Sequence, residues 1–234
     1  MTLDILMVCD IVYDMPARNS IKTYIENGYY HLYNRGVEKR ITFLDEQDYK
    51  VFLSYLKDYL LPKDRKSLMD RLSDPAISPR ERESVLKQLR LNNFANELSL
   101  IAYCLMPNHF HMLVKQKSAN TIDRFMQSIS TRDTMYFNHK YKRVGSLYQA
   151  VYKAVLVRSD EQLLQVTRYI HKQALKLGNQ PCSYSEYVGK RNTEWVKPQE
   201  ILAYFSKTVP SLSYRAFVEE QNDYLVLKNL LLES

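Results

Sequence analysis

Two strand-like runs separated by only two residues constrain the fold of this chain more than any other feature of its sequence. The run LSLIAYCLM at 98–106 leads into a Pro-Asn dipeptide typical of turns, and the run HFHMLVKQ follows at 109–116. Two further runs, YYHLYN at 29–34 and SLYQAVYKAVLV at 146–157, also have the composition of strands. We therefore expect four strands.

Three amphipathic segments lie between and after these strands. Apolar residues recur at helical spacing in 45–61, 121–141 and 161–178. Asp45 marks the start of the first predicted helix, and Ser159 begins a capping-box pattern before the last. The order of elements is that of an α+β fold, with a ferredoxin-like antiparallel sheet and helices on one face.

The chain of 234 residues is long enough for one domain with appendages. We expect an N-terminal extension at 1–16, a globular domain at 17–180 and a small helical tail at 181–234. Within the domain, the highly charged segment 63–97 carries two short helical patterns. It predicts a helical insertion at the surface.

Cysteine content and the absence of long apolar runs indicate the compartment. The three cysteines, at 9, 104 and 182, form no Cys-x-x-Cys pair, so neither a disulfide framework nor a zinc ribbon is expected. The opening segment lacks the basic start and cleavage site of a signal peptide. No run reaches the roughly 18 apolar residues of a membrane span. We therefore expect a cytoplasmic protein that has no membrane partner.

Positive charge is concentrated in one part of the chain. The net charge is +7, and the segment 115–158 alone holds nine basic residues against two acidic ones, so it accounts for the whole surplus. Such a segment is typical of a nucleic-acid footprint, but also of solvated helix faces. Charge alone leaves both interpretations open.

The residues with chemical potential fall on one predicted strand and one predicted helix. His109 and His111 alternate with Phe110, so both imidazoles should share one face of the sheet. Two imidazoles suit a divalent metal but are too few to hold it. Tyr169 and Gln173 are four residues apart and share a helix face, so Gln173 can add a carbonyl oxygen beside the phenol. Taken singly, each residue fits ordinary packing equally well.

The stretch PNHFHMLV resembles the His–hydrophobic–His motif of the HUH single-tyrosine transposases, and most of all bacterial REP-associated tyrosine transposases and their insertion-sequence relatives. The segments GYYHLYNRGVEKRITFLDEQDY, GSLYQAVYKAVLV and RYIHKQA match in the family's order, so the resemblance covers about residues 17–178. It implies a DNA-cutting and rejoining enzyme of the bacterial cytoplasm, associated with the nucleoid. Met15 resembles a family start, and it is our alternative to Met1 as the start residue.

The resemblance also assigns roles. It implies that His109, His111 and Gln173 bind Mg²⁺ or Mn²⁺, and that Tyr169 is the nucleophile that forms a 5′-phosphotyrosine. The chain departs from the family pattern at two places. Gln173 is followed by Ala where the family often has Asn followed by Pro, and Val151 stands where many members have an Arg that contacts DNA.

The implied partner is single-stranded or hairpin DNA. The candidate contacts to its phosphates are basic residues: Arg35, Lys39, Arg40, Lys115, Lys117, Arg124, Arg132, Lys142 and Arg143. Insertion-sequence relatives act as homodimers and REP-associated ones can act alone, so both assemblies stay open. His31 is either a neighbour of the metal ligands, a DNA contact or a structural histidine, and neither His139 nor His171 is assigned to the metal.

Two other functions are compatible with the same residues. A metal phosphohydrolase that uses water as nucleophile would make Tyr169 incidental and would release DNA without a covalent adduct. A hairpin-binding repressor descended from a transposase would bind DNA without cutting it. The intact set of Tyr169, Gln173 and the two histidines favours the transposase.

Overall fold

The computed structural model describes residues 22–178 and 180–220. Four strands form one antiparallel sheet in the order β2-β3-β1-β4. Their bounds are Tyr29–Arg35 for β1, Leu98–Met106 for β2, His109–Gln116 for β3 and Lys153–Val157 for β4. This is the strand order of a ferredoxin-like sheet, so the predicted α+β class and antiparallel sheet are confirmed.

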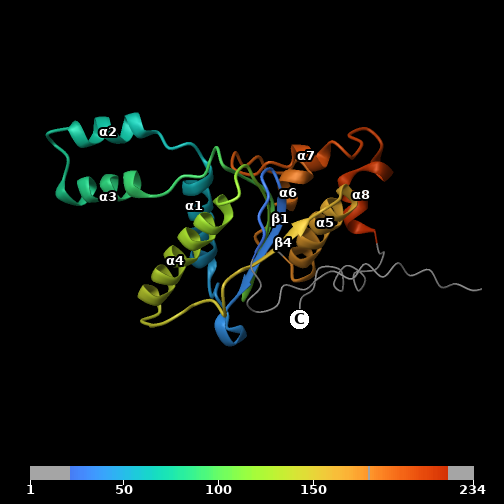
Figure 1. The fold of residues 1–234 in the computed structure, drawn as a ribbon, viewed down its shortest axis with the longest axis horizontal. Coiled ribbons are helices and arrows are strands. Elements are labelled where there is room, and N and C mark those ends of the chain that lie inside the picture. The colour runs from blue at the N-terminus through green and yellow to red at the C-terminus, as the bar shows by residue number, and fades with distance from the viewer. Residues whose placement is uncertain (1–21, 179, 221–234) are drawn as a thin grey trace, which may run out of the picture.

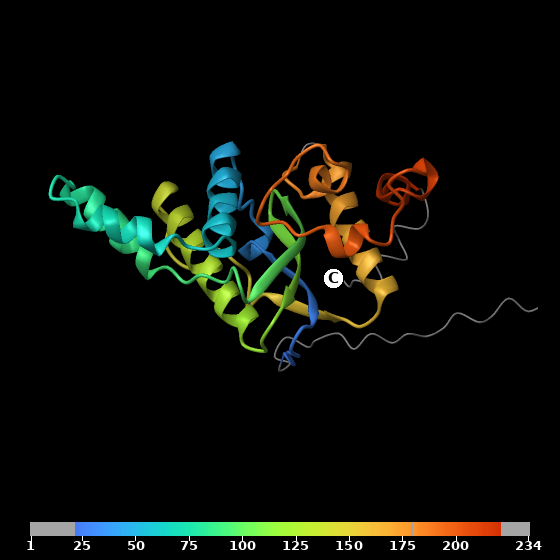
Figure 2. The same cartoon turned by 90° about the horizontal axis from the view of Figure 1, so that it is seen from above.

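Two helices cover one face of the sheet, as predicted for a ferredoxin-like unit, and a third covers the other (Figures 1 and 2). Helices α1 (Glu46–Leu60) and α4 (Thr121–Lys140) pack on the face that carries Phe110 and Met112 of β3. Helix α5 (Asp160–Lys176) packs on the opposite face, against Leu113. The side chains of β3 therefore alternate between two separate cores.

The fourth strand is shorter than predicted. The pattern indicated a strand over 146–157, but β4 begins at Lys153. The segment before it follows the end of β1 instead, where the amide of Gln149 donates to the carbonyl of Arg35. Tyr148 is buried there, and its hydroxyl donates to Asp133 at 2.6 Å. The aromatic and apolar residues that resemble a strand in the sequence thus fill a loop beside the core.

A buried carboxylate joins α1 to α4. The carboxylate of Asp48 accepts hydrogen bonds from Lys140 at 2.7 Å, Tyr141 at 2.8 Å and Tyr136 at 3.0 Å, and from the amide of Leu44 at 2.8 Å. Burial favours the protonated carboxyl, but these hydrogen bonds outweigh it and lower the pKa of Asp48. The charged form of Asp48 therefore holds the two helices together.

We expect the substitution Asp48→Asn to reduce the free energy of unfolding by about 2 kcal/mol at neutral pH, because it removes the charge of a buried carboxylate that pairs with the partly exposed Lys140. Urea unfolding of both proteins measures this. The matched control is Asp45→Asn, which makes the same change at the exposed N-cap of α1 and keeps a capping side chain. It should cost less than about 1 kcal/mol. Equal losses in the two variants would show that Asp48 does not have this role.

The predicted insertion contains two antiparallel helices. Helices α2 (Arg65–Ser73) and α3 (Pro79–Arg90) extend away from the sheet on the side of α1 and α4 (Figures 1 and 2). Of their side chains only Leu68 and Val85 are buried. The rest of this hairpin is largely exposed and highly charged.

The tail after α5 forms short helices that pack beside α5 and β2 (Figure 1). They are α6 (Tyr184–Tyr187), α7 (Gln199–Leu202) and α8 (Tyr214–Glu219), with a 3-10 turn at Pro210–Leu212. A second 3-10 turn, at Val37–Lys39, follows β1. The extension predicted at 1–16 and the last residues of the tail fall outside the described residues. No helix in the described ranges has the length and apolar character needed to cross a membrane.

Candidate active site

The two histidines of β3 lie on the face of the sheet that α5 covers. His109 and His111 are next-nearest neighbours on the strand, and their ring centroids are 5.0 Å apart with the rings nearly perpendicular. Phe110 between them is fully buried in the opposite core. His111 is also fully buried, whereas His109 at the start of the strand is partly exposed. His109, next to the turn between β2 and β3, is therefore the more exposed of the two histidines.

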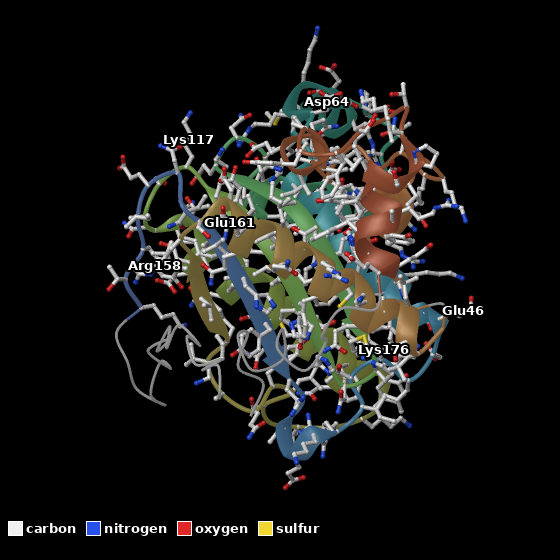
Figure 3. All side chains as sticks on the ribbon, turned by 90° about the vertical axis from the view of Figure 1, so that its right-hand side faces the viewer. Glu46, Asp64, Lys117, Arg158, Glu161 and Lys176 are labelled. Atoms are coloured by element: carbon white, nitrogen blue, oxygen red, sulfur yellow. The ribbon has the colours of Figure 1, made fainter. Side chains whose placement is uncertain are left out.

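Helix α5 places Tyr169 directly over His111. Figure 3 looks onto this face, with α5 running across the sheet from Glu161 near its start to Lys176 at its end. The Tyr169 ring is fully buried, and its centroid lies 5.6 Å from that of His111 in an edge-to-face contact. One turn later, Gln173 donates a hydrogen bond from Nε2 to the Tyr169 hydroxyl at 2.6 Å.

Strand β1 adds two residues on the same face: His31, for which the sequence left three roles open, and Tyr33, which the sequence did not single out. His31 Nε2 and His111 Nδ1 share a hydrogen bond of 2.9 Å. Tyr33 lies directly opposite His111 in the β1–β3 pairing, with ring centroids 5.7 Å apart. The alternation of His31, Tyr33 and Arg35 along β1 was the signal in the sequence, but it needed the register with β3 to become informative.

Two imidazoles and one amide make the candidate metal site. Within residues 22–178 and 180–220, no group of three or more His, Cys, Asp and Glu side chains is arranged to hold a metal. His109 is held through Nδ1 by Asn108 Oδ1 at 2.6 Å, and His111 is held through Nδ1 by His31. Nδ1 is thus engaged in both rings, and two imidazole nitrogens with an amide oxygen are a donor set that fits a divalent cation of mixed nitrogen and oxygen preference.

A family model described as "Transposase IS200 like" matches residues 55–173, which is more than half of the chain. The chain belongs to the IS200-like transposase family. No curated protein matches the sequence.

Two solved structures are similar to this transposase. One is a REP-associated tyrosine transposase bound to a REP hairpin, with 13% identity and a TM-score of 0.47, covering 76% of this chain and 96% of that one. The other, from Deinococcus radiodurans R1, is provisionally assigned as a transposase, with 17% identity and a TM-score of 0.27. That match covers 66% of this chain and 97% of the other.

Three of the predicted DNA contacts of this transposase lie at the His109 end of the sheet. Arg35 is opposite His109 in the β1–β3 pairing, and Lys39 and Arg40 follow in a tight loop. The side chain of Asn108 donates to the carbonyl of Lys39 at 3.2 Å, which fixes this loop beside the turn before β3. Arg35 is thus beside His109 and the backbone of Lys39 is held near it, whereas Arg40 pairs with Glu38 at 3.7 Å.

The other predicted contacts are spread more widely. Four have protein partners: Arg124 pairs with Glu97, Arg132 with Asp58, Lys115 with Glu200, and Arg143 bonds to Asn138 and Ser146. Arg124 and Arg132 are on α4, across the sheet from α5. Lys117 and Lys142 are exposed, and Lys117 follows β3 at the end remote from His109. The segment with the highest charge therefore does not form a single surface around the site.

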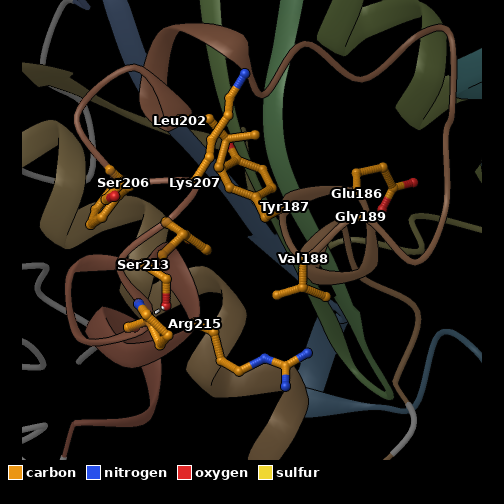
Figure 4. Close-up of a pocket in the computed structure, with 12 residues that line it drawn as sticks. Glu186, Tyr187, Val188, Gly189, Leu202, Ser206, Lys207, Ser213 and Arg215 are labelled. Carbon is orange, nitrogen blue, oxygen red and sulfur yellow. Dashed lines mark hydrogen bonds between the residues drawn. The ribbon is translucent and has the colours of Figure 1, made fainter.

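A separate cavity of about 580 Å³ lies among the short helices of the tail (Figure 4). Its walls include Tyr187 and Leu202, with Lys207 and Arg215 among its polar residues. None of the residues that line it belongs to the predicted metal and nucleophile set. It is therefore distinct from the site between β3 and α5.

His171 contacts the tail and is not part of the candidate metal site. Its ring is fully buried, with Nδ1 2.6 Å from the Tyr214 hydroxyl and Nε2 2.7 Å from Ser183 Oγ. Burial lowers the pKa of the His171 imidazole from 6.5 to about 3. The neutral ring therefore connects α5 to α6 and α8.

This pKa predicts a loss of stability in acid. Below pH 6.5 the unfolded chain binds a proton at His171, whereas the folded chain does not until about pH 3. The free energy of unfolding therefore has its full value above pH 6.5. It falls as the pH drops towards 3, by up to about 1.4 kcal/mol per pH unit. Urea unfolding of wild type and His171→Gln from pH 4 to 8 measures the difference in slope. Parallel profiles would exclude this linkage, and His139→Gln, at an exposed position on α4, is the control.

Proposed function

We propose that this transposase cuts single-stranded DNA by attack of the Tyr169 hydroxyl on a phosphodiester. The observation that carries the proposal is the position of the buried Tyr169 phenol against His111, with Gln173 bonded to its oxygen. The phenol gives up its proton as its oxygen forms a bond to phosphorus, and the bond from phosphorus to the 3′ oxygen breaks. The 3′ oxygen takes up a proton, so the products are a 3′-OH and a 5′-phosphotyrosine.

The metal-binding residues are proposed to be His109, His111 and Gln173. When bound there, Mg²⁺ or Mn²⁺ neutralises charge on the scissile phosphate and polarises it. Gln173 has a second task, because the hydrogen bond from its Nε2 to the phenol oxygen favours the phenolate. Burial of Tyr169 keeps water away from the nucleophile and orients the ring.

Strand transfer follows from the same chemistry in reverse. The phosphotyrosine keeps the energy of the phosphodiester, so the 3′-OH of another strand can displace Tyr169 without ATP. We propose single-stranded DNA with a hairpin as the substrate, held by backbone phosphate contacts. Arg35 is the best-placed cation for this, because it lies opposite His109, and Lys39 and Arg40 follow in the loop that Asn108 holds beside the site.

The test follows the two halves of a cleaved strand. Hairpin oligonucleotides from the protein's own locus are labelled at either end and incubated with wild-type protein and Mn²⁺, with EDTA as the control. The 3′-end label should become attached to protein under denaturing conditions, and the 5′-end label should appear on a shorter strand without protein. Mass spectrometry should then find the adduct on Tyr169, which trypsin places in the peptide 169–172.

Two results would overturn the proposal. Cleavage that leaves both labelled fragments without attached protein would mean that water is the nucleophile. Binding of the hairpin with no cleavage at any Mn²⁺ concentration would favour a repressor.

A further inference from the structure

His31 makes a direct contact with a proposed metal ligand. Its Nε2 lies 2.9 Å from Nδ1 of His111, and the two rings are nearly parallel, with centroids 5.1 Å apart. Both side chains are fully buried. On the sheet, His31 lies opposite Leu113, so it reaches His111 diagonally and from the side away from His109.

The neighbouring histidine shows what such a contact achieves. His109 Nδ1 lies 2.6 Å from Asn108 Oδ1, and a carbonyl oxygen only accepts hydrogen bonds. Nδ1 of His109 is therefore a donor, and in the neutral ring Nε2 carries the lone pair that a metal needs. Asn108 thus fixes the tautomer of His109 that can bind a metal.

For His111, the tautomer depends on which of the two imidazoles, His31 or His111, donates the hydrogen bond. A hydrogen bond between two imidazole nitrogens requires a proton on one of them and a lone pair on the other. If His31 donated, a neutral His111 would carry its proton on Nε2 and could not bind a metal through that atom. If His111 donates from Nδ1, its Nε2 has the lone pair and His31 carries its own proton on Nδ1.

We propose that His31 is a positioning residue that accepts the hydrogen bond from His111 Nδ1 and so holds His111 as a metal ligand through Nε2. The inference rests on the proposed function, because it concerns the same metal site. His31 itself does not bind the metal in this arrangement, since its Nε2 is occupied by His111. Its burial beneath α5, with the Tyr169 ring centroid 6.1 Å away, keeps the pair of imidazoles in one geometry.

Metal affinity of the protein without DNA tests this role. Mn²⁺ is titrated calorimetrically into wild type, His31→Phe and His31→Gln. Phe keeps a ring at this position but cannot accept a hydrogen bond, whereas the Gln side chain can accept one near the place of Nε2. We expect His31→Phe to bind Mn²⁺ about 10- to 100-fold more weakly, and His31→Gln to stay close to wild type.

A second measurement needs no substitution at His31. In ¹⁵N-histidine-labelled wild type at neutral pH without metal, NMR should show a protonated Nδ1 and a bare Nε2 at His111. A proton on Nε2 of His111 would overturn the proposal even if His31→Phe failed to fold. Thermal unfolding of the metal-free variants shows which of them are folded.

The outcomes separate this inference from the proposed function. If wild type binds Mn²⁺ and forms the covalent adduct while folded His31→Phe binds Mn²⁺ equally well, only the positioning role is wrong. If His31→Gln loses as much affinity as His31→Phe, His31 acts by packing and the role is also wrong. If wild type binds no Mn²⁺, the proposed metal chemistry fails and this inference fails with it.

Discussion

Replacement of Tyr169 by Phe is expected to reduce formation of the covalent protein–DNA adduct by about 10³-fold or more, because it removes the nucleophilic oxygen. The change leaves the aromatic ring in place, so the edge contact with His111 and the packing under α5 should persist. Rates from a denaturing gel with hairpin DNA and Mn²⁺, for both proteins, measure the effect.

Tyr33→Phe is the matched control. Tyr33 also lies beside His111, at a ring centroid distance of 5.7 Å, but it is on β1 and makes no part of the proposed nucleophile. It should retain adduct formation close to wild type. Tyr169→Phe should also stay folded, because the lost hydrogen bond with Gln173 contributes only about 1 kcal/mol. If Tyr169→Phe still formed the adduct, the nucleophile would be another residue. Loss of the adduct in Tyr33→Phe but not in Tyr169→Phe would point to Tyr33.

Much of this site follows from two periodicities in the sequence. The alternation of His109 and His111 around Phe110 predicts that both imidazoles share a face, and the strand places them there. The spacing of Tyr169 and Gln173 predicts a common helix face, and the two side chains are hydrogen-bonded. Both are local properties, so no knowledge of the tertiary fold was needed.

The parts that the sequence does not provide depend on long-range register. His31 and His111 are 80 residues apart, and their hydrogen bond exists only because β1 and β3 pair with His31 opposite Leu113. A shift of one residue would place His31 in the other core. The side of the sheet that α5 covers is likewise set by the connection after β4, which hydrophobic periodicity does not describe.

Charge density was also an incomplete guide. The charge of segment 115–158 left a nucleic-acid footprint and solvated helix faces both open, and in the structure Arg132 pairs with Asp58 at 2.8 Å and lies over the Tyr55 ring at 3.9 Å. Arg124 pairs with Glu97 at 3.1 Å. Both contacts join α4 to segments far away in the chain, so a count of charges along the sequence could not separate structural cations from those that face DNA.

Removal of the histidine pair is the second large effect that we expect. The variants His109→Ala and His111→Ala should each lower the rate of DNA cleavage by about 10³-fold, because a bound metal contributes several kcal/mol of charge stabilisation at the phosphate. His109→Ala is the cleaner of the two, since His109 is only partly buried and the variant should fold like wild type. His139→Ala, at an exposed position on α4, is the control and should cleave normally.

Binding of DNA should respond differently from cleavage. The cations Arg35, Lys39 and Arg40 are unchanged in these variants, and phosphate contacts supply most of the affinity for nucleic acid. Hairpin DNA should therefore bind His109→Ala with nearly wild-type affinity in a filter or fluorescence assay at fixed salt, although the variant no longer cuts it. Cleavage by His109→Ala at the wild-type rate, or by wild type in excess EDTA, would show that the reaction does not depend on a metal at these histidines. A parallel loss of binding and cleavage would mean that His109 acts in DNA binding, and the metal role would then rest on His111 and Gln173 alone.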